Sequence, residues 1–111
     1  MKKTRIHLLG LGIAFVLFAL SASPARAQSA SATYKAKCAM CHGTDGKGDT
    51  PAGKSMGAHN FASPEIQKMT DAELESVIAK GKGKMPQYDT KLKEGEIKEL
   101  VAYIRELGKG K

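Results

Sequence analysis

Apolar side chains recur at helical spacing toward the end of the chain. Between Glu94 and Leu107 they are three or four residues apart, at Ile97, Leu100, Val101, Ile104 and Leu107. This pattern predicts an amphipathic helix over residues 94–107 with one face on the core. Gly108 is a typical helix stop, whereas Lys93 is a poor N-cap.

A second apolar face follows a clear helix-start signal. Thr70 and Glu73 have the spacing of a capping box, and Gly81 marks the end of the predicted helix. The apolar face between them consists of Leu74, Val77 and Ile78. Just before this helix, Pro64 suits the first position of a short helix over residues 64–69.

The residues before the first cysteine also have a helical pattern. Residues 29–41 lack Gly and Pro, and Tyr34 and Cys38 lie one turn apart on one face. Residues 43–63 are rich in Gly and predict a loop, as do residues 82–92. No stretch alternates apolar and polar residues as a strand would, so the predicted fold is all-α.

The N-terminus has the three-part pattern of a secretory signal peptide. Three basic residues lie within the first five, and the run from Leu8 to Leu20 carries no charge. Small residues, Ala25 and Ala27, precede a possible cleavage site before Gln28. The competing interpretation is a membrane anchor, but this run has 13 residues and a span needs about 20.

These features predict a cleavable leader at residues 1–27 and one domain at residues 28–111. Without a twin-Arg pair, we expect export by the Sec route to the periplasm. The net charge is +7, and the leader supplies four basic residues and no acidic one, so residues 28–111 carry only +3. That charge is too low for a nucleic-acid-binding protein, because neutralising phosphates needs a dense basic face.

The predicted domain is poor in core residues. Of its 84 residues, only 18 are apolar side chains other than Ala and Cys. Small domains of this kind usually need a disulfide, a metal or a cofactor. The two cysteines could close only a very short loop, so we expect a cofactor to fill the centre.

Cys38, Cys41 and His42 form a C-x-x-C-H motif, which is the attachment motif for c-type haem. Two thiols at this spacing can reach two vinyl groups, and the adjacent histidine can bind iron. A thioredoxin-like dithiol would need a βαβ context, which the pattern lacks. A zinc site would need two further ligands, of which His59 could be one.

A methionine in the second predicted loop is the candidate for the sixth iron ligand. Pro86 keeps Met85 out of helical geometry, and Gly81 and Gly83 free the chain before it. A soft thioether in such a loop suits iron ligation. Met85 could instead cover the core without touching metal.

Four other side chains compete less well for this position. Met56 lies in the Gly-rich loop and stays a candidate by spacing. His59 is the rival ligand, although a lone loop histidine is usually solvated. Met40 lies inside the cysteine motif and should point away from His42, and Met69 reads as a core residue.

Together these segments resemble a small single-haem class I cytochrome c of the periplasmic kind. Tyr34–Gly43 is similar to the first helix and attachment site of that family, Gly81–Pro86 to its methionine loop, and Leu100–Arg105 to its last helix. The resemblance implies an all-α class I cytochrome c fold, with three to four helices wrapped around one covalently attached haem c.

The resemblance also implies roles for single residues. Haem c would be attached through Cys38 and Cys41, and its iron would be ligated by His42 and Met85. The carbonyl of Pro51 would accept a hydrogen bond from the axial histidine, which orients the ring.

In that family the first and last helices cross, with aromatic residues near the crossing. The resemblance gives this role to Tyr34 and Tyr103, and the role of the small residue to Ala30.

The function expected from this ligand set is one-electron transfer by a soluble periplasmic carrier, not an enzyme. Its partners would be redox proteins such as a respiratory reductase or oxidase. We expect a monomer, with no nucleic acid and no stable membrane insertion after cleavage. The alternative is a haem enzyme or ligand sensor with an open or displaceable sixth position. Lysines near the methionine loop could be merely solvated or could dock an acidic partner: Lys80, Lys82, Lys84, Lys91 and Lys93.

Overall fold

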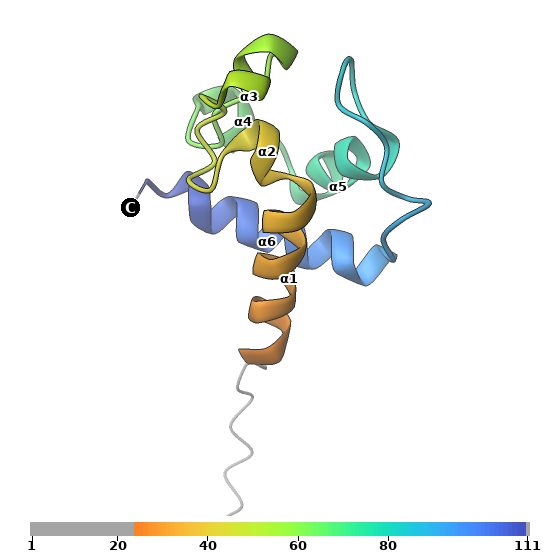
Figure 1. The fold of residues 1–111 in the computed structure, drawn as a ribbon. Helices are drawn as coiled ribbons and strands as arrows, with labels where there is room; N and C mark the ends of the chain where they lie inside the picture. Colours follow the sequence, from red (N-terminus) through yellow and green to blue (C-terminus); the bar gives the residue numbers. More distant parts are fainter. Residues whose placement is uncertain (1–23, 111) are drawn as a thin grey trace, which may run out of the picture.

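The computed structural model describes residues 24–110, which contain six helices and no strand (Figure 1). The helices are α1 (Pro24–Lys37), α2 (Ala39–His42), α3 (Pro51–Met56), α4 (Pro64–Gln67), α5 (Asp71–Lys80) and α6 (Glu94–Gly108). The predicted all-α fold is therefore confirmed, with six helices in these residues instead of the three to four expected. Most of the predicted leader lies outside the described residues, and its last four residues form the first turn of α1.

Helices α1 and α6 cross and pack against each other (Figure 1). Tyr34 of α1 is fully buried, and its ring lies 5.1 Å from the ring of Tyr103 on α6, between centroids. Ala30, one turn before Tyr34, is 5% exposed. The predicted crossing and the roles of these three residues are confirmed.

The apolar faces predicted for α5 and α6 form the core. Its buried members on these two helices are Leu74, Ile78, Ile97, Leu100, Val101 and Ile104. At the start of α5, the N–H of Glu73 donates to the Thr70 hydroxyl and the N–H of Thr70 donates to the Glu73 carboxylate. This confirms the capping box. At the start of α6, the backbone N–H of Lys93 donates to the Glu96 carboxylate at 2.7 Å.

The prediction of a loop over residues 43–63 was wrong in part, because it contains α3. Thr50 caps this helix by accepting the N–H of Gly53 at 2.9 Å, and Pro51 occupies the first turn. Gly57 ends the helix in the left-handed region, at φ +70°. Six residues carry no apolar period, so only these end signals could have revealed α3.

The helix predicted over residues 29–41 is interrupted. It divides at Cys38 into α1 and the single turn α2. Helix α3 packs directly on α2: a Cβ added at Gly53 would lie 2.1 Å from the carbonyl oxygen of Cys41. The close approach of these short helices places the C-x-x-C-H motif on a rigid support.

Candidate haem site

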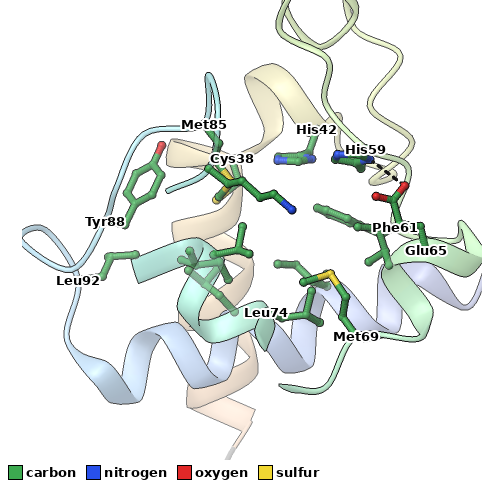
Figure 2. A pocket seen from close by; sticks show the side chains of 16 residues that line it. Cys38, His42, His59, Phe61, Glu65, Met69, Leu74, Met85, Tyr88 and Leu92 are labelled. Atoms are coloured by element: carbon green, nitrogen blue, oxygen red, sulfur yellow. Dashed lines mark ion pairs between the residues drawn. The ribbon is translucent and has the colours of Figure 1, made fainter. Parts of the chain in front are cut away.

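An apolar cavity lies between the C-x-x-C-H motif, α5, α6 and the loop after α5 (Figure 2). It encloses about 100 Å³ and adjoins a second, outer cavity of about 310 Å³ that is lined by more exposed residues. Apolar side chains dominate the wall of the first cavity: Phe61, Ile66, Met69, Leu74, Val77, Ile78, Leu92, Leu100 and Ile104. Cys38, His42, Met85 and Tyr88 line both cavities. The core thus opens around the predicted site residues instead of closing there.

Both cysteines are free thiols. Burial raises the pKa of Cys38 to about 11, with Cys41 adding to the rise and Lys37 opposing it. A dithiol that exchanges disulfides needs a lowered thiol pKa, so the environment of Cys38 argues against redox chemistry at sulfur. Among residues 24–110, no three side chains of His, Cys, Asp or Glu come together as metal ligands, which argues against the zinc alternative.

His42 ends α2, and its ring stacks on Phe61 with centroids 4.7 Å apart. Its Nδ1 atom is buried and has no hydrogen-bond partner in the part of the chain that the structure describes. Burial lowers the pKa of His42, and the charge of His59 acts in the same direction while the His59 backbone opposes it. The neutral imidazole is therefore favoured, and this is the form that binds a metal.

The carbonyl of Pro51 is not placed as the resemblance implied. Pro51 is an exposed residue in the first turn of α3. The Nδ1 atom of His42 has no hydrogen-bond partner among the described residues, so it does not donate to the Pro51 carbonyl. The formation of α3 explains the difference, because a carbonyl in the first turn of a helix faces the N–H four residues later in the same helix.

The methionines differ in their access to the cavity. Met85 is half-buried and lines both cavities, whereas Met69 lines only the inner one. Met56 is 43% exposed at the outer cavity, and Met40 is 77% exposed, as its place in the motif predicts. Met69 was expected to be a core residue; the structure also brings it to the cavity wall, so two thioethers face this space.

The loop that carries Met85 has a defined conformation. The N–H of Lys82 donates to the Met85 carbonyl at 3.2 Å, and the N–H of Met85 donates to the Lys82 carbonyl at 3.0 Å. Gly81 has φ +74°, and a Cβ there would lie 2.5 Å from the Met85 carbonyl oxygen. Gly81 therefore allows a tight turn in which a side chain at this position would overlap the Met85 backbone.

His59 lies beside the cavity with its side chain 54% exposed. Its Nδ1 atom is 3.6 Å from a carboxylate oxygen of Glu65, and Figure 2 shows this pair at the edge of the cavity. The pairing agrees with the ordinary role of a loop histidine more than with iron ligation.

Sequence reasoning missed two residues that support the site. The Thr50 hydroxyl contacts the carbonyl oxygens of Met40 and Cys41, at 2.7 and 3.0 Å, and so covers the end of α2. The Tyr88 hydroxyl donates to the carbonyl of Lys37 at 3.1 Å. A Thr-Pro pair was a usable signal for the first, but nothing local marked the second, because its partner is 51 residues away.

These residues fit a covalently attached haem. Within residues 24–110, the two thiols form no disulfide, the buried Nδ1 atom of His42 has no hydrogen-bond partner, and the cavity beside them is apolar. Each of these features would be costly or unexplained in a chain that folds around its own side chains alone.

Comparison with known proteins also indicates a c-type haem protein. The family model for "Cytochrome C oxidase, cbb3-type, subunit III" matches residues 25–104. A cytochrome c6 from Nostoc sp. is 33% identical, over 98% of this chain and 95% of its own. A cbb3-type oxidase subunit CcoP from Azospirillum brasilense is 32% identical over 82% of this chain.

The chain spans about a third of the length of that oxidase subunit. A solved structure, the KustC0563 c-type cytochrome, matches with a TM-score of 0.65 at 34% identity, over 70% of this chain and 95% of its own. The matches to the cytochromes c6 and to this structure cover nearly the whole of those proteins. The chain therefore belongs to the cbb3-type subunit III family of cytochrome c domains, and it is a small class I c-type cytochrome that carries covalent haem c.

Proposed function

We propose that this electron-transfer haem protein is a soluble periplasmic one-electron carrier whose iron is ligated by His42 and Met85. The observation that carries the proposal is the apolar cavity, which a neutral imidazole from α2 and a thioether from a Gly- and Pro-bounded loop both line. Haem c supplies the redox chemistry when bound, since its iron exchanges one electron between the ferric and ferrous states.

The two proposed ligands explain why a carrier is favoured over an enzyme or a sensor. With both axial positions filled by the chain, no position stays open for a substrate or a diatomic ligand. A thioether donates weakly and favours the reduced iron, so Met85 would raise the potential. The apolar wall acts in the same direction, because it disfavours the more charged state.

Rigid support for His42 is the second contribution of the chain. Its ring stacks on Phe61, and its helix is held by α3 and by the Thr50 hydroxyl. A ligand that moves little between redox states keeps the reorganisation small, which suits fast electron transfer.

The periplasmic location rests on the N-terminal pattern. We propose that residues 1–27 are removed on export and that residues 28–111 form the working domain. Across residues 24–110, no helix has the length and apolar character needed to cross a membrane.

The outer cavity suggests where a redox partner would dock. Among the described residues, its lining includes no carboxylate but three lysines: Lys37, Lys82 and Lys84. The exposed side chain of Met56 adds apolar surface at the same place. A partner with an acidic face around an apolar centre would match this surface. Of the five lysines expected near the loop, Lys82 and Lys84 are the two in this lining.

The ligand set can be tested with carbon monoxide, which binds ferrous haem only at a free position. The reduced wild-type protein should not bind it, and Met85→Ala should bind it readily and have a lower potential. Met69→Leu is the matched control, because it removes the other cavity thioether and should behave like wild type. Carbon monoxide binding by the Met69 variant but not by Met85→Ala would assign the ligand to Met69, and binding by wild type would favour an enzyme or sensor.

A further inference from the structure

We infer that Tyr88 is a positioning residue for the sixth-ligand loop, and that its hydroxyl ties this loop to the haem-attachment segment. The inference rests on the proposed function, since it assigns Tyr88 the role of keeping Met85 in place. The bond in question runs from the Tyr88 hydroxyl to the carbonyl of Lys37, the residue just before Cys38.

The interruption of the first helix leaves this carbonyl free to be bound. Helix α1 ends at Lys37, and Cys38 has φ −118° and ψ −36°. The N–H groups of Cys41 and His42 both donate to the carbonyl of Cys38, at 3.2 and 3.0 Å. The N–H of Cys41 therefore does not bind the carbonyl of Lys37, as it would in a continuous helix. This carbonyl accepts a hydrogen bond from the Tyr88 hydroxyl instead, at 3.1 Å.

The Tyr88 bond can restrain Met85 because the backbone of Tyr88 belongs to the same loop and is itself bonded to α5. Its N–H donates to the carbonyl of Ile78 in α5 at 3.1 Å, and its carbonyl accepts the N–H of Leu92 at 2.8 Å. At the other end of the loop, the N–H of Gly81 donates to the carbonyl of Val77 at 2.8 Å. The loop from Gly81 to Tyr88 is thus fixed to α5 at both ends.

Two side chains of this loop form hydrogen bonds with other segments of the chain: Tyr88 with the end of α1, and Lys84 with α3. Tyr88 is half-buried and lines both cavities (Figure 2). Lys84 makes the second contact, with its Nζ atom 3.3 Å from the carbonyl oxygen of Ser55; both contacts are exposed, but that of Lys84 depends on a longer and more flexible side chain. A tyrosine side chain has two rotatable bonds before its ring and oxygen, so it loses less freedom when it holds such a bond.

Movement of Met85 away from the cavity would require the loop to lift from the attachment segment. The Tyr88–Lys37 bond opposes that movement and favours the closed loop. Loss of one such hydrogen bond should make the sixth position about 2- to 12-fold easier for a competing ligand to occupy.

The test uses ferric holoprotein at neutral pH, titrated with imidazole as the competing ligand. Tyr88→Phe keeps the ring and removes only the hydroxyl, and it should bind imidazole about 2- to 12-fold more tightly than wild type. Tyr103→Phe removes a hydroxyl at the α1–α6 crossing and should match wild type. Thermal midpoints are measured in parallel, because a purely structural role would lower the midpoint and leave imidazole affinity unchanged.

Met85→Ala serves as the arm that tests the proposed ligand itself. If it binds imidazole no more tightly than wild type, the ligand assignment to Met85 is contradicted. If it binds more tightly but Tyr88→Phe equals wild type, only the positioning role is contradicted. Loss of haem from Tyr88→Phe alone would also contradict it, because a bond on the sixth-ligand side should not affect covalent attachment.

Discussion

Glycine positions show how closely single residues determine this site. A Cβ at Gly53 would overlap the carbonyl oxygen of Cys41, and a Cβ at Gly81 would overlap that of Met85. The sequence identified Gly81 as a source of freedom near Met85, but the approach of Gly53 to α2 could not be predicted. That contact depends on how two short helices pack, and no local pattern records it.

Two alanine substitutions separate tight glycines from free ones. Gly81→Ala should lower the free energy of unfolding by about 1–3 kcal/mol, because φ is +74° and the new Cβ would overlap the Met85 carbonyl. Gly95→Ala is the control: it lies within α6 with open space around it, and should raise stability by about 0.5–1 kcal/mol. Denaturant unfolding of both holoproteins measures this, and equal effects of the two substitutions would contradict the assignment.

At the scale of helices, periodic apolar patterns predicted the long helices correctly, whereas the short helices α2 and α3 were not predicted as separate elements. The apolar faces and end signals predicted α5 and α6 within a residue or so of their observed ends. The single turns around the cysteine motif have no period of their own. Tertiary contacts determine them, and the division at Cys38 was therefore not visible in the sequence.

The capping box of α5 makes a prediction about pH. Hydrogen bonds from the Thr70 backbone and hydroxyl lower the pKa of Glu73. Its carboxylate therefore stabilises the fold above its ordinary pKa, and that contribution is lost as the pH falls through the lowered value. Glu73→Gln should be less stable than wild type at neutral pH, and the difference should shrink below about pH 4.

Thr70→Ala is a second test of the same capping box. It should cost about 1 kcal/mol, because the N–H of Glu73 loses its acceptor. Thermal unfolding followed at several pH values measures both variants. A Glu73→Gln penalty that grows in acid would contradict the role given to the carboxylate.

For the whole molecule, the uneven distribution of charge matters more than the total. Residues 28–111 carry little net charge, yet within residues 24–110 the lining of the outer cavity has three lysines and no acidic residue. The sequence placed lysines near the methionine loop. Only the fold shows which of them share one surface with the cavity, and that Lys37 of α1 joins them.

Electron exchange with a small anionic oxidant tests this surface. Oxidation of the reduced protein by hexacyanoferrate(III) should slow as ionic strength rises, because salt screens the attraction. Lys82→Glu with Lys84→Glu should slow it several-fold or more at low salt. Lys98→Glu is the control, since Lys98 lies on α6 and pairs with Glu94 at 3.0 Å. Equal slowing by the control would show that only total charge matters.

The central claim is that the chain fills both axial positions of its haem and so acts as a carrier. A redox titration of the purified protein, followed by visible absorption under argon and under carbon monoxide, tests it most directly. We predict one reversible one-electron transition with low-spin spectra in both states and the same midpoint under either gas. A midpoint that shifts upward under carbon monoxide, with a changed ferrous spectrum, would contradict the account.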